Sequence, residues 1–297
     1  MGTGPRHGTS NPVSRRSRFA PLPRAAPLPH TSAGRRTVPS LLVPAVSMVL
    51  LLAGCGTGSA GTSKITLPRG AEALVLRAQH YPSSPAAPGT PLPDYALYGD
   101  RKIYTPGPTT GALPGVRVQL LTVQAVERLY RRALSAGLEQ ARTYGSPAPD
   151  APGLIVTLGA AGGTPVTRVF KPDPAEKGRR GDVARLAALT PDQLPPADRT
   201  GGSVPYAYSR LAVTAGIWGS GKAPEARPWP LGPLGVGEQV NGGSCTVLTG
   251  EDLDRARTLL TSARPDALWT SGNSTFRLQF RPLLPGERGC GDLKLAG

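Results

Sequence analysis

Glycine and proline place the strongest limit on the fold of this chain. There are 38 glycines and 34 prolines among 297 residues. Proline lacks the backbone donor that helix interiors and central strands use, and glycine favours turns. We therefore expect short elements joined by many turns, in a chain long enough for one large domain or two small lobes.

Alternating apolar residues predict short strands in the second part of the chain. The strands are expected at 73–80, 116–120, 154–158, 206–215, 245–248 and 276–280. Two hairpins are expected, one within 95–104 around Gly99-Asp100 and one in which Gly162-Gly163 leads to 166–170. Residues 171–181, 190–204 and 218–243 are expected to be irregular connections.

Helical spacing of apolar residues marks three amphipathic segments. The first follows Thr122 as its N-cap and stops at Gly137, and the second is short and is capped by Asp182. The third follows Thr249, with Asp252 in place of the usual glutamate of a capping box. Short antiparallel strands and hairpins packed with two or three such helices predict an α+β fold.

A weak internal repeat relates the first and third helical segments. A shift of 127 residues places Leu121-Thr122 on Leu248-Thr249. If the repeat is real, the domain consists of two related lobes, 64–200 and 206–297, with a groove between them. Chance likeness between amphipathic helices that follow short strands is the alternative, and it stays open.

A basic pair and an apolar run precede a cysteine near the N-terminus. Arg35-Arg36 is followed by the apolar residues 41–52 and then by Ala53-Gly54 before Cys55. This order is typical of a secretory signal peptide. The alternatives are a buried core helix and a membrane-spanning helix, although spanning requires about 20 apolar residues.

Leu52-Ala53-Gly54-Cys55 resembles the lipobox of bacterial lipoproteins. The resemblance implies cleavage before Cys55, lipid attachment to Cys55 and anchoring on the outer face of the cell membrane. Arg35-Arg36 also resembles a twin-arginine export signal, but Val38 departs from that motif, so Sec and Tat export both stay open. The predicted parts are a signal peptide with a disordered basic leader at 1–54, a flexible tether at 55–63 and an α+β extracytoplasmic domain at 64–297.

Cleavage would lower the net charge of the chain from +15, because residues 1–54 hold seven arginines and no acid. The remaining 27 basic and 19 acidic residues give a net charge of +8. Such an excess favours anionic partners, here lipid head groups or anionic envelope polymers. There is no basic run with interleaved aromatic residues, so nucleic acid is not expected as a partner.

Two cysteines, Cys245 and Cys290, remain once Cys55 carries lipid. An even pair outside the cytoplasm is expected to form a disulfide, and two free buried thiols are the alternative.

Two segments match nucleotide-binding motifs, but the residues around them do not provide what such a site needs. Residues 56–61 match G-x-G-x-x-G but follow the lipidation site, and residues 216–222 resemble a P-loop whose next residue, Ala223, lacks the hydroxyl that binds magnesium. His80 is the only histidine after residue 54, which argues against a histidine zinc site and a Ser-His-Asp triad. No cofactor and no metal are therefore expected.

Carboxylate chemistry stays open as an alternative function. Glu251, Asp252 and Asp254 cluster, but they lie in the first turn of a predicted helix, where acids complement the helix dipole. A cell-wall hydrolase would need a carboxylate pair at a separation that the sequence does not reveal.

Two groups of residues are candidates for ligand contact. Tyr98 with Arg101 and Lys102 could form a binding face on a hairpin, although tyrosines also pack across strands. Trp218 and Trp229 flank the Gly/Pro-rich stretch 218–243, and one of them could instead pin that loop to the core.

The C-terminal residues resemble lipoproteins of high-GC Gram-positive bacteria. The similarity lies in the strand 245–248, the helix after it, and Phe280-Arg281-Pro282-Leu283-Leu284-Pro285 leading to Cys290, and it implies no particular activity. The sequence thus favours a non-enzymatic envelope lipoprotein that binds a ligand or a partner, such as another envelope protein. The hydrolase is the alternative.

Overall fold

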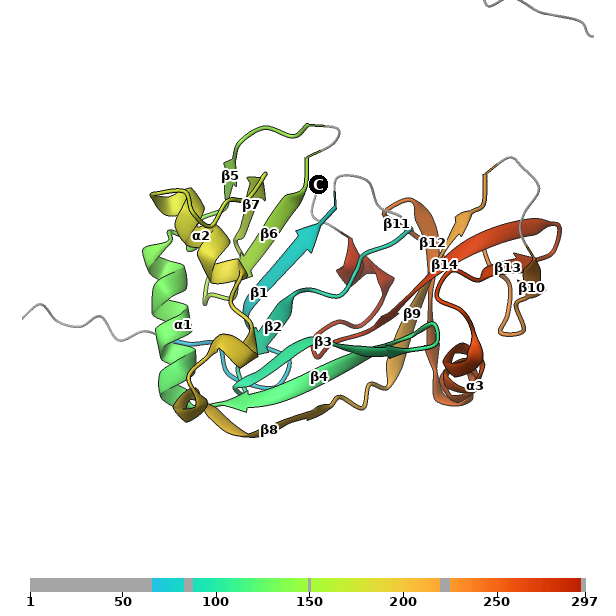
Figure 1. Cartoon of the computed structure of the whole chain (residues 1–297), viewed down its shortest axis with the longest axis horizontal. Coiled ribbons are helices and arrows are strands. Elements are labelled where there is room, and N and C mark those ends of the chain that lie inside the picture. Colours follow the sequence, from blue (N-terminus) through green and yellow to red (C-terminus); the bar gives the residue numbers. More distant parts are fainter. Residues whose placement is uncertain (1–65, 83–87, 149–150, 220–224, 295–297) are drawn as a thin grey trace, which may run out of the picture. The chain divides into compact units, whose positions relative to one another are not determined.

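Two sheets of mainly antiparallel strands form the framework of the protein (Figure 1). The computed structural model describes residues 66–82, 88–148, 151–219 and 225–294. They belong to one compact unit, 62–297, and confirm the α+β class. The predicted signal peptide, the tether and Cys55 lie outside the described residues.

The first sheet has eight strands in the order β5-β7-β6-β1-β2-β3-β4-β8. They are β1 (Leu74–Tyr81), β2 (Tyr95–Tyr98), β3 (Lys102–Thr110), β4 (Leu113–Leu121), β5 (Arg142–Tyr144), β6 (Gly153–Leu158), β7 (Val166–Phe170) and β8 (Arg199–Pro205). Both predicted hairpins are confirmed, since β2 pairs antiparallel with β3, and β6 pairs antiparallel with β7.

The second sheet has six strands in the order β10-β13-β14-β9-β12-β11. They are β9 (Arg210–Ile217), β10 (Ala226–Pro228), β11 (Glu238–Val240), β12 (Gly243–Thr249), β13 (Leu268–Ser271) and β14 (Ser274–Pro282). The α-helices are α1 (Val123–Ser135), α2 (Arg179–Ala187) and α3 (Gly250–Ser262), and the short 3-10 helices are η1 (Pro191–Gln193), η2 (Pro196–Asp198) and η3 (Cys290–Leu293).

Some predicted connections contain strands that have no apolar alternation. β8 lies in the expected connection 190–204, and β10 and β11 lie in 218–243. β8 is an edge strand that pairs with β4 through its backbone while most of its side chains stay exposed. Its sequence therefore lacks the apolar pattern from which buried strands are predicted.

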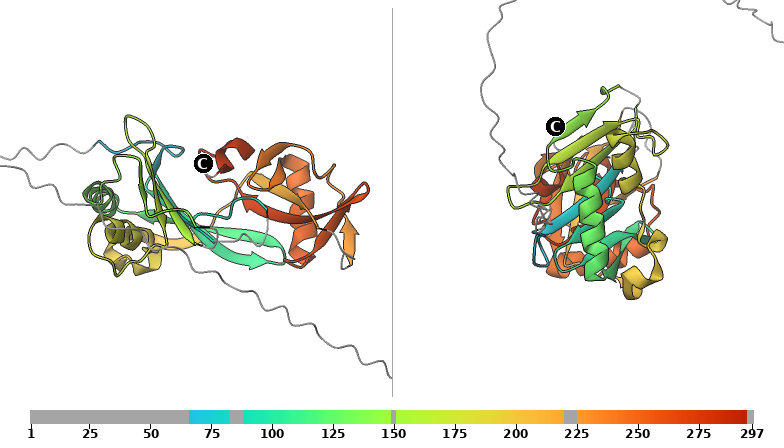
Figure 2. Two further views of the ribbon diagram at one scale, coloured as in Figure 1. Left: turned by 90° about the horizontal axis from the view of Figure 1, so that it is seen from above. Right: turned by 90° about the vertical axis from the view of Figure 1, so that its left-hand side faces the viewer.

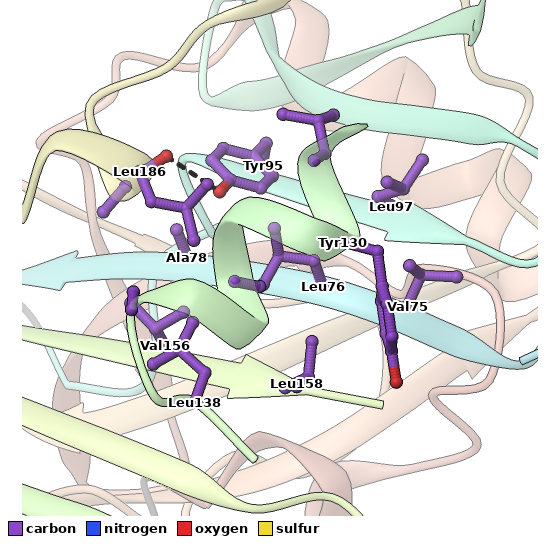
Figure 3. Packing of buried hydrophobic residues seen from close by; sticks show 14 of the residues in the cluster. Val75, Leu76, Ala78, Tyr95, Leu97, Tyr130, Leu138, Val156, Leu158 and Leu186 are labelled. Atoms are coloured by element: carbon purple, nitrogen blue, oxygen red, sulfur yellow. Dashed lines mark hydrogen bonds between the residues drawn. The ribbon is translucent and has the colours of Figure 1, made fainter. Parts of the chain in front are cut away.

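Helix α1 begins and ends as its sequence predicts. The hydroxyl of Thr122 accepts a hydrogen bond from the N–H of Ala125 at 3.2 Å, and Gly137 follows the helix with φ +80°. Tyr130 and the other apolar side chains of α1 pack on the first sheet beside Leu76, Val156 and Leu158 (Figure 3). Helix α2 lies beside α1 (Figure 2) and packs against the same core, where the Tyr95 hydroxyl donates to the Leu186 carbonyl at 3.0 Å (Figure 3).

The predicted cap of α2 is wrong, whereas Thr249 is the N-cap residue of α3 as predicted but lacks the expected capping hydrogen bond. Gly178, not Asp182, is the N-cap of α2, and Asp182 lies in the first turn, where its carboxylate pairs with Arg185 at 2.5 Å. Thr249 precedes α3, but its side chain makes no capping hydrogen bond, and Asp252 pairs with Arg255 instead. Asp182 and Asp252, which were expected to bind backbone N–H groups at a helix N-terminus, thus form ion pairs with an arginine three positions later.

Helix α3 covers one face of the second sheet. The apolar residues of β14, Phe276, Leu278 and Phe280, are buried on this face together with Leu260 of α3. The opposite face is covered by the C-terminal segment (283–294), where Leu283, Cys290 and Leu293 pack with Cys245 and Val240. The predicted disulfide between Cys245 and Cys290 is present and attaches this segment to β12.

The predicted repeats share the order strand, helix, strand along the chain, but their strands are arranged differently in the two sheets. α1 and α3 each contain 13 residues and follow β4 and β12. In the second sheet β14 pairs with β9 next to β12, whereas β2 and β3 separate β4 from β1 and β6 in the first sheet. The boundary between the sheets falls between Pro205 and Arg210.

The tip of the β3–β4 hairpin contacts the second core. The N–H of Ala112 donates to the carbonyl of Leu260 at 2.8 Å, and the Ala112 side chain is buried in the core beneath α3. Gly111 has φ +60°, and a Cβ there would lie 2.3 Å from the carbonyl oxygen of Thr261. Only glycine fits this position without displacing the helix end.

A buried ion cluster makes a second connection between the sheets. The carboxylate of Glu287 accepts two hydrogen bonds from Arg281 of β14, at 2.7 and 2.8 Å, and one from Arg77 of β1 at 2.6 Å. The N–H of Leu284 donates to the same carboxylate at 2.8 Å. Only 3% of the Arg281 and Glu287 side chains is exposed. Burial alone would raise the pKa of Glu287, but the two guanidinium groups and the N–H hold it below its usual range.

The loop before β2 makes a third connection. The Pro91 carbonyl accepts from Arg281 Nε at 3.2 Å and from Gln79 Nε2 at 3.1 Å. The N–H of Gly89 donates to the carbonyl of Asn241 at 3.0 Å, and the Asn241 side chain donates to the carbonyl of Leu293 at 3.2 Å. This loop therefore joins β1, β14 and the C-terminal segment.

Gly111→Ala is expected to destabilise the protein more than Gly272→Ala. Both glycines have φ near +60°, but a Cβ at Gly272 meets no atom within 4 Å. Left-handed strain costs about 1–2 kcal/mol at either position, and crowding adds about 1–3 kcal/mol at Gly111. Urea unfolding of both variants measures the difference, and equal losses would show that the hairpin tip does not press on α3.

Glu287→Gln is expected to lower the free energy of unfolding by about 3–5 kcal/mol, because the buried Arg281 and the partly buried Arg77 lose their counter-charge. The matched control is Glu238→Gln, which removes the exposed ion pair with Lys294 and should cost at most about 1 kcal/mol. Thermal unfolding of both variants tests this, and similar losses would contradict a special role for the cluster.

Candidate ligand-binding pocket

The candidate contact residue Tyr98 is buried, with 1% of its surface exposed. Its ring packs edge-on against Tyr104, with centroids 5.5 Å apart, and burial raises the pKa of its hydroxyl to about 12. The prediction that Tyr98 contributes to an exposed binding face is therefore wrong. The tyrosines of this hairpin pack across strands.

Arg101 and Lys102 lie at the turn between β2 and β3. Arg101 adopts φ +68°, and its carbonyl accepts from the N–H of Leu121 at 3.0 Å. The ammonium group of the exposed Lys102 lies 2.8 Å from a carboxylate oxygen of Asp100. The two cations are thus tied to the turn and share no exposed face with Tyr98.

Trp229 belongs to the second core. Only 8% of it is exposed, and its ring centroid lies 5.2 Å from that of Trp269 and 6.0 Å from that of Phe280. The interpretation of Trp229 as an exposed contact is therefore wrong, and this residue pins its loop to the core.

Trp218 is partly exposed and lies directly after β9. Its N–H donates to the carbonyl of Thr275 at 2.8 Å, which extends the β9–β14 pairing by one residue. The guanidinium carbon of Arg277 lies 4.7 Å from the centre of the Trp218 ring, within the range of a cation–π interaction. The backbone of two paired strands thus fixes the position of this tryptophan.

A pocket of about 300 Å³ opens beside Trp218. Leu268 and Arg277 are direct cross-strand partners on β13 and β14, and Ala226 of β10 pairs with Leu268 on the other side. The residues that line the pocket are Trp218, Glu225, Arg227, Arg264, Asp266, Ala267, Leu268 and Arg277. The pocket therefore combines an aromatic ring with three guanidinium groups and two carboxylates.

One pair of these charges is compensated within the pocket wall. Arg264 donates two hydrogen bonds to Asp266, at 2.9 and 2.8 Å, and these hydrogen bonds lower the pKa of Asp266. Among the described residues, Arg227 has no carboxylate partner and Glu225 has no basic partner. Arg227 is exposed on β10, whose backbone pairs with β13.

Two other hollows lack this combination of residues. One of about 540 Å³ lies between α1 and α2, where Asp182 already pairs with Arg185. The other, of about 420 Å³, lies between the β3–β4 hairpin and 205–208. There the guanidinium of Arg257 lies over the ring of Tyr208 and donates to its carbonyl, so this cation is engaged.

The carboxylates with a shifted pKa do not match the general acid that a glycosidase needs. Such an enzyme needs one carboxylic acid whose pKa is raised toward neutrality. The two acids with a shifted pKa, Asp266 and Glu287, both titrate below their usual range. No three His, Cys, Asp or Glu side chains gather as a metal site within the described ranges. None of the described helices has the length and apolar character needed to cross a membrane.

The arginines of the pocket were not predicted from the sequence. Arg277 alternates with Phe276 and Leu278 and therefore lies on the face away from α3. The alternation in the sequence could have placed Arg277 on that face. The pairing register of β14 with β9, which brings Arg277 beside Trp218, cannot be derived from the sequence of one strand. Arg264 and Asp266 come from the loop after α3, which has no periodic pattern.

His80 forms an ion pair at the end of β1. Its Nδ1 lies 2.8 Å from Asp94 Oδ2, and its backbone N–H donates to the same oxygen at 2.7 Å. The hydrogen bond with Asp94 raises the pKa of His80 above 6.5, although partial burial opposes this. The pair is partly exposed, and no described residue completes it as a nucleophilic triad.

The His80–Asp94 pair predicts a small pH dependence of stability. Because its folded-state pKa is raised, the contribution of His80 is complete below the unfolded pKa of about 6.5 and is lost as the pH rises through the folded value. NMR titration of the imidazole should therefore give a pKa above 6.5, and Asp94→Asn should lower it. An unchanged pKa in that variant would contradict the pairing.

The comparisons with known proteins add no family to this description. The chain matches no protein-family model, and no curated protein and no solved structure is significantly similar to it.

Proposed function

We propose that the protein is a lipid-anchored, extracytoplasmic binding protein of the cell envelope, and that the Trp218 pocket holds its ligand. The observation that carries this proposal is the pocket itself, in which an aromatic ring lies beside guanidinium and carboxylate groups. A few polar groups around an apolar surface are typical of sites that orient a small ligand.

The size of the pocket favours a ligand group of about one ring. A volume of about 300 Å³ lies at the lower end of the range for small-molecule sites. The apolar face of a sugar ring stacks on indole, and its hydroxyl groups bind arginine and carboxylate side chains. A sugar unit, alone or within an envelope polymer, fits this chemistry.

The lipobox supports the proposed place of action. Lipid on Cys55 would anchor a domain whose first described residue, Thr66, lies 11 positions further along the chain. A fully extended chain of that length spans at most about 40 Å. The domain would thus work close to the outer face of the membrane.

A carboxylate hydrolase is the alternative, and one observation favours it. Glu225 and Asp266 line the same pocket and are the acids that such an enzyme would use. Because Arg264 keeps the pKa of Asp266 low, Asp266 would serve such an enzyme as its ionised carboxylate, and Glu225 would have to be the general acid, which must be protonated near neutral pH.

The anchor is tested by expressing the full chain in a bacterium that processes lipoproteins and feeding labelled palmitate. We expect the label on the wild-type protein and none on Cys55→Ala. Equal labelling of both, or labelling of neither, would contradict lipidation at this residue.

The pocket is tested by calorimetric titration with glucose and with a disaccharide of N-acetylglucosamine and N-acetylmuramic acid. We expect Trp218→Ala to weaken binding at least about tenfold, because it removes the stacking surface. The control is Ile217→Ala, which truncates the neighbouring side chain, itself 78% exposed. Release of reducing sugar from the disaccharide would favour the hydrolase instead.

A further inference from the structure

We infer that the ligand of the Trp218 pocket carries an anionic group, a carboxylate or a phosphate, beside its ring, and that Arg227 binds this group. The inference rests on the proposed function and specifies the ligand class of that same site. Some of the charges that line the pocket pair with each other, and the charge that is left without a partner indicates the ligand.

The first step concerns the balance of charge. Three guanidinium groups and two carboxylates line the pocket, so its wall carries a net positive charge. Arg264 and Asp266 neutralise each other through two hydrogen bonds. Arg277 lies over the Trp218 ring. An anionic ligand is therefore favoured over a cationic one.

The second step identifies Arg227. Within the described part of the chain it makes no ion pair, even with Glu225, which lines the same pocket two positions earlier. Its strand is fixed by the pairing of Arg227 with Trp269, and the N–H of Trp229 donates to the carbonyl of Thr270 at 2.9 Å. A strand that is paired with β13 thus presents an uncompensated guanidinium group to the pocket.

The third step concerns geometry. Guanidinium is planar and donates two parallel hydrogen bonds to a carboxylate or a phosphate. Because Arg227 and Trp218 line one pocket of about 300 Å³, a single ligand unit can place its ring on the indole and its anionic group on Arg227. Uronic acids, lactyl-bearing amino sugars and sugar phosphates have this arrangement.

The test compares three probes with the same ring: glucose, glucuronate and glucose 6-phosphate, each titrated by calorimetry into the full chain. We expect at least one anionic probe to bind about tenfold more tightly than glucose, with the preference decreasing as salt is added. The better of the two identifies carboxylate or phosphate as the group recognised.

Three variants separate the roles of the side chains. Arg227→Gln should remove the preference for the anionic probe over glucose, whereas Trp218→Ala should weaken the binding of all three probes by the same factor and keep that preference. The control is Arg255→Gln, which removes an exposed arginine of α3 that pairs with Asp252, and should keep the preference. Thermal unfolding of each variant verifies that it is folded.

The failures are distinguishable. Equal affinity of the wild-type protein for the three probes would overturn the anionic ligand while leaving the proposed binding function intact. A preference that persists in Arg227→Gln would overturn the assignment to this residue. Absence of binding by all three probes would overturn the inference and contradict the sugar-binding function on which it rests.

Discussion

The carboxylate of Glu287 lies between the guanidinium groups of Arg77 and Arg281, and the two sheets depend on this contact because it joins β1 to β14. Arg281 and Glu287 are nearly excluded from water and Arg77 is partly buried, so the charges need one another to compensate their burial. The loop at Pro91 accepts from Arg281, and the C-terminal segment supplies Glu287 itself. The disulfide between Cys245 and Cys290 attaches the same segment to β12. Charge pairing and covalent chemistry therefore hold one short segment against both sheets.

The strand that carries Arg281, β14, also lines the Trp218 pocket through Arg277. Arg281 and Arg277 lie on the same strand and alternate with the buried residues Phe276, Leu278 and Phe280, so they share the face that α3 does not cover. At one end of that face Arg281 is buried with Glu287. At the other end Arg277 lies over the Trp218 ring beside the open pocket. A ligand at the pocket thus contacts a strand that is held in place at its far end. Such preorganisation lowers the entropy that ordering of the site would otherwise cost on binding.

Helices and strands with a periodic apolar face could be predicted from the sequence. Elements and residues that are held in place only by contacts with distant parts of the chain could not. Helix α1, with Thr122 before it and Gly137 after it, and strand β14 follow their apolar patterns. β8 has no such pattern, because an edge strand needs only backbone pairing. Both Trp218 and Trp229 border the same Gly/Pro-rich stretch, and nothing in the sequence tells an exposed tryptophan from a buried one. Only the fold shows that Trp218 lines a pocket and that Trp229 is buried. Glu287 lies in a short polar stretch without periodicity, so its pairing with Arg77, 210 residues away, was not foreseeable.

The buried cluster, the hairpin tip and the Pro91 loop should make the two sheets one cooperative unit. Native-state amide hydrogen exchange tests it by comparing β6 in the first core with β9 in the second. We expect the slowest amides of both strands to open with the same free energy and to respond alike to low concentrations of denaturant. A lower opening free energy for one strand, with its own denaturant dependence, would show that the sheets unfold independently and would contradict the account.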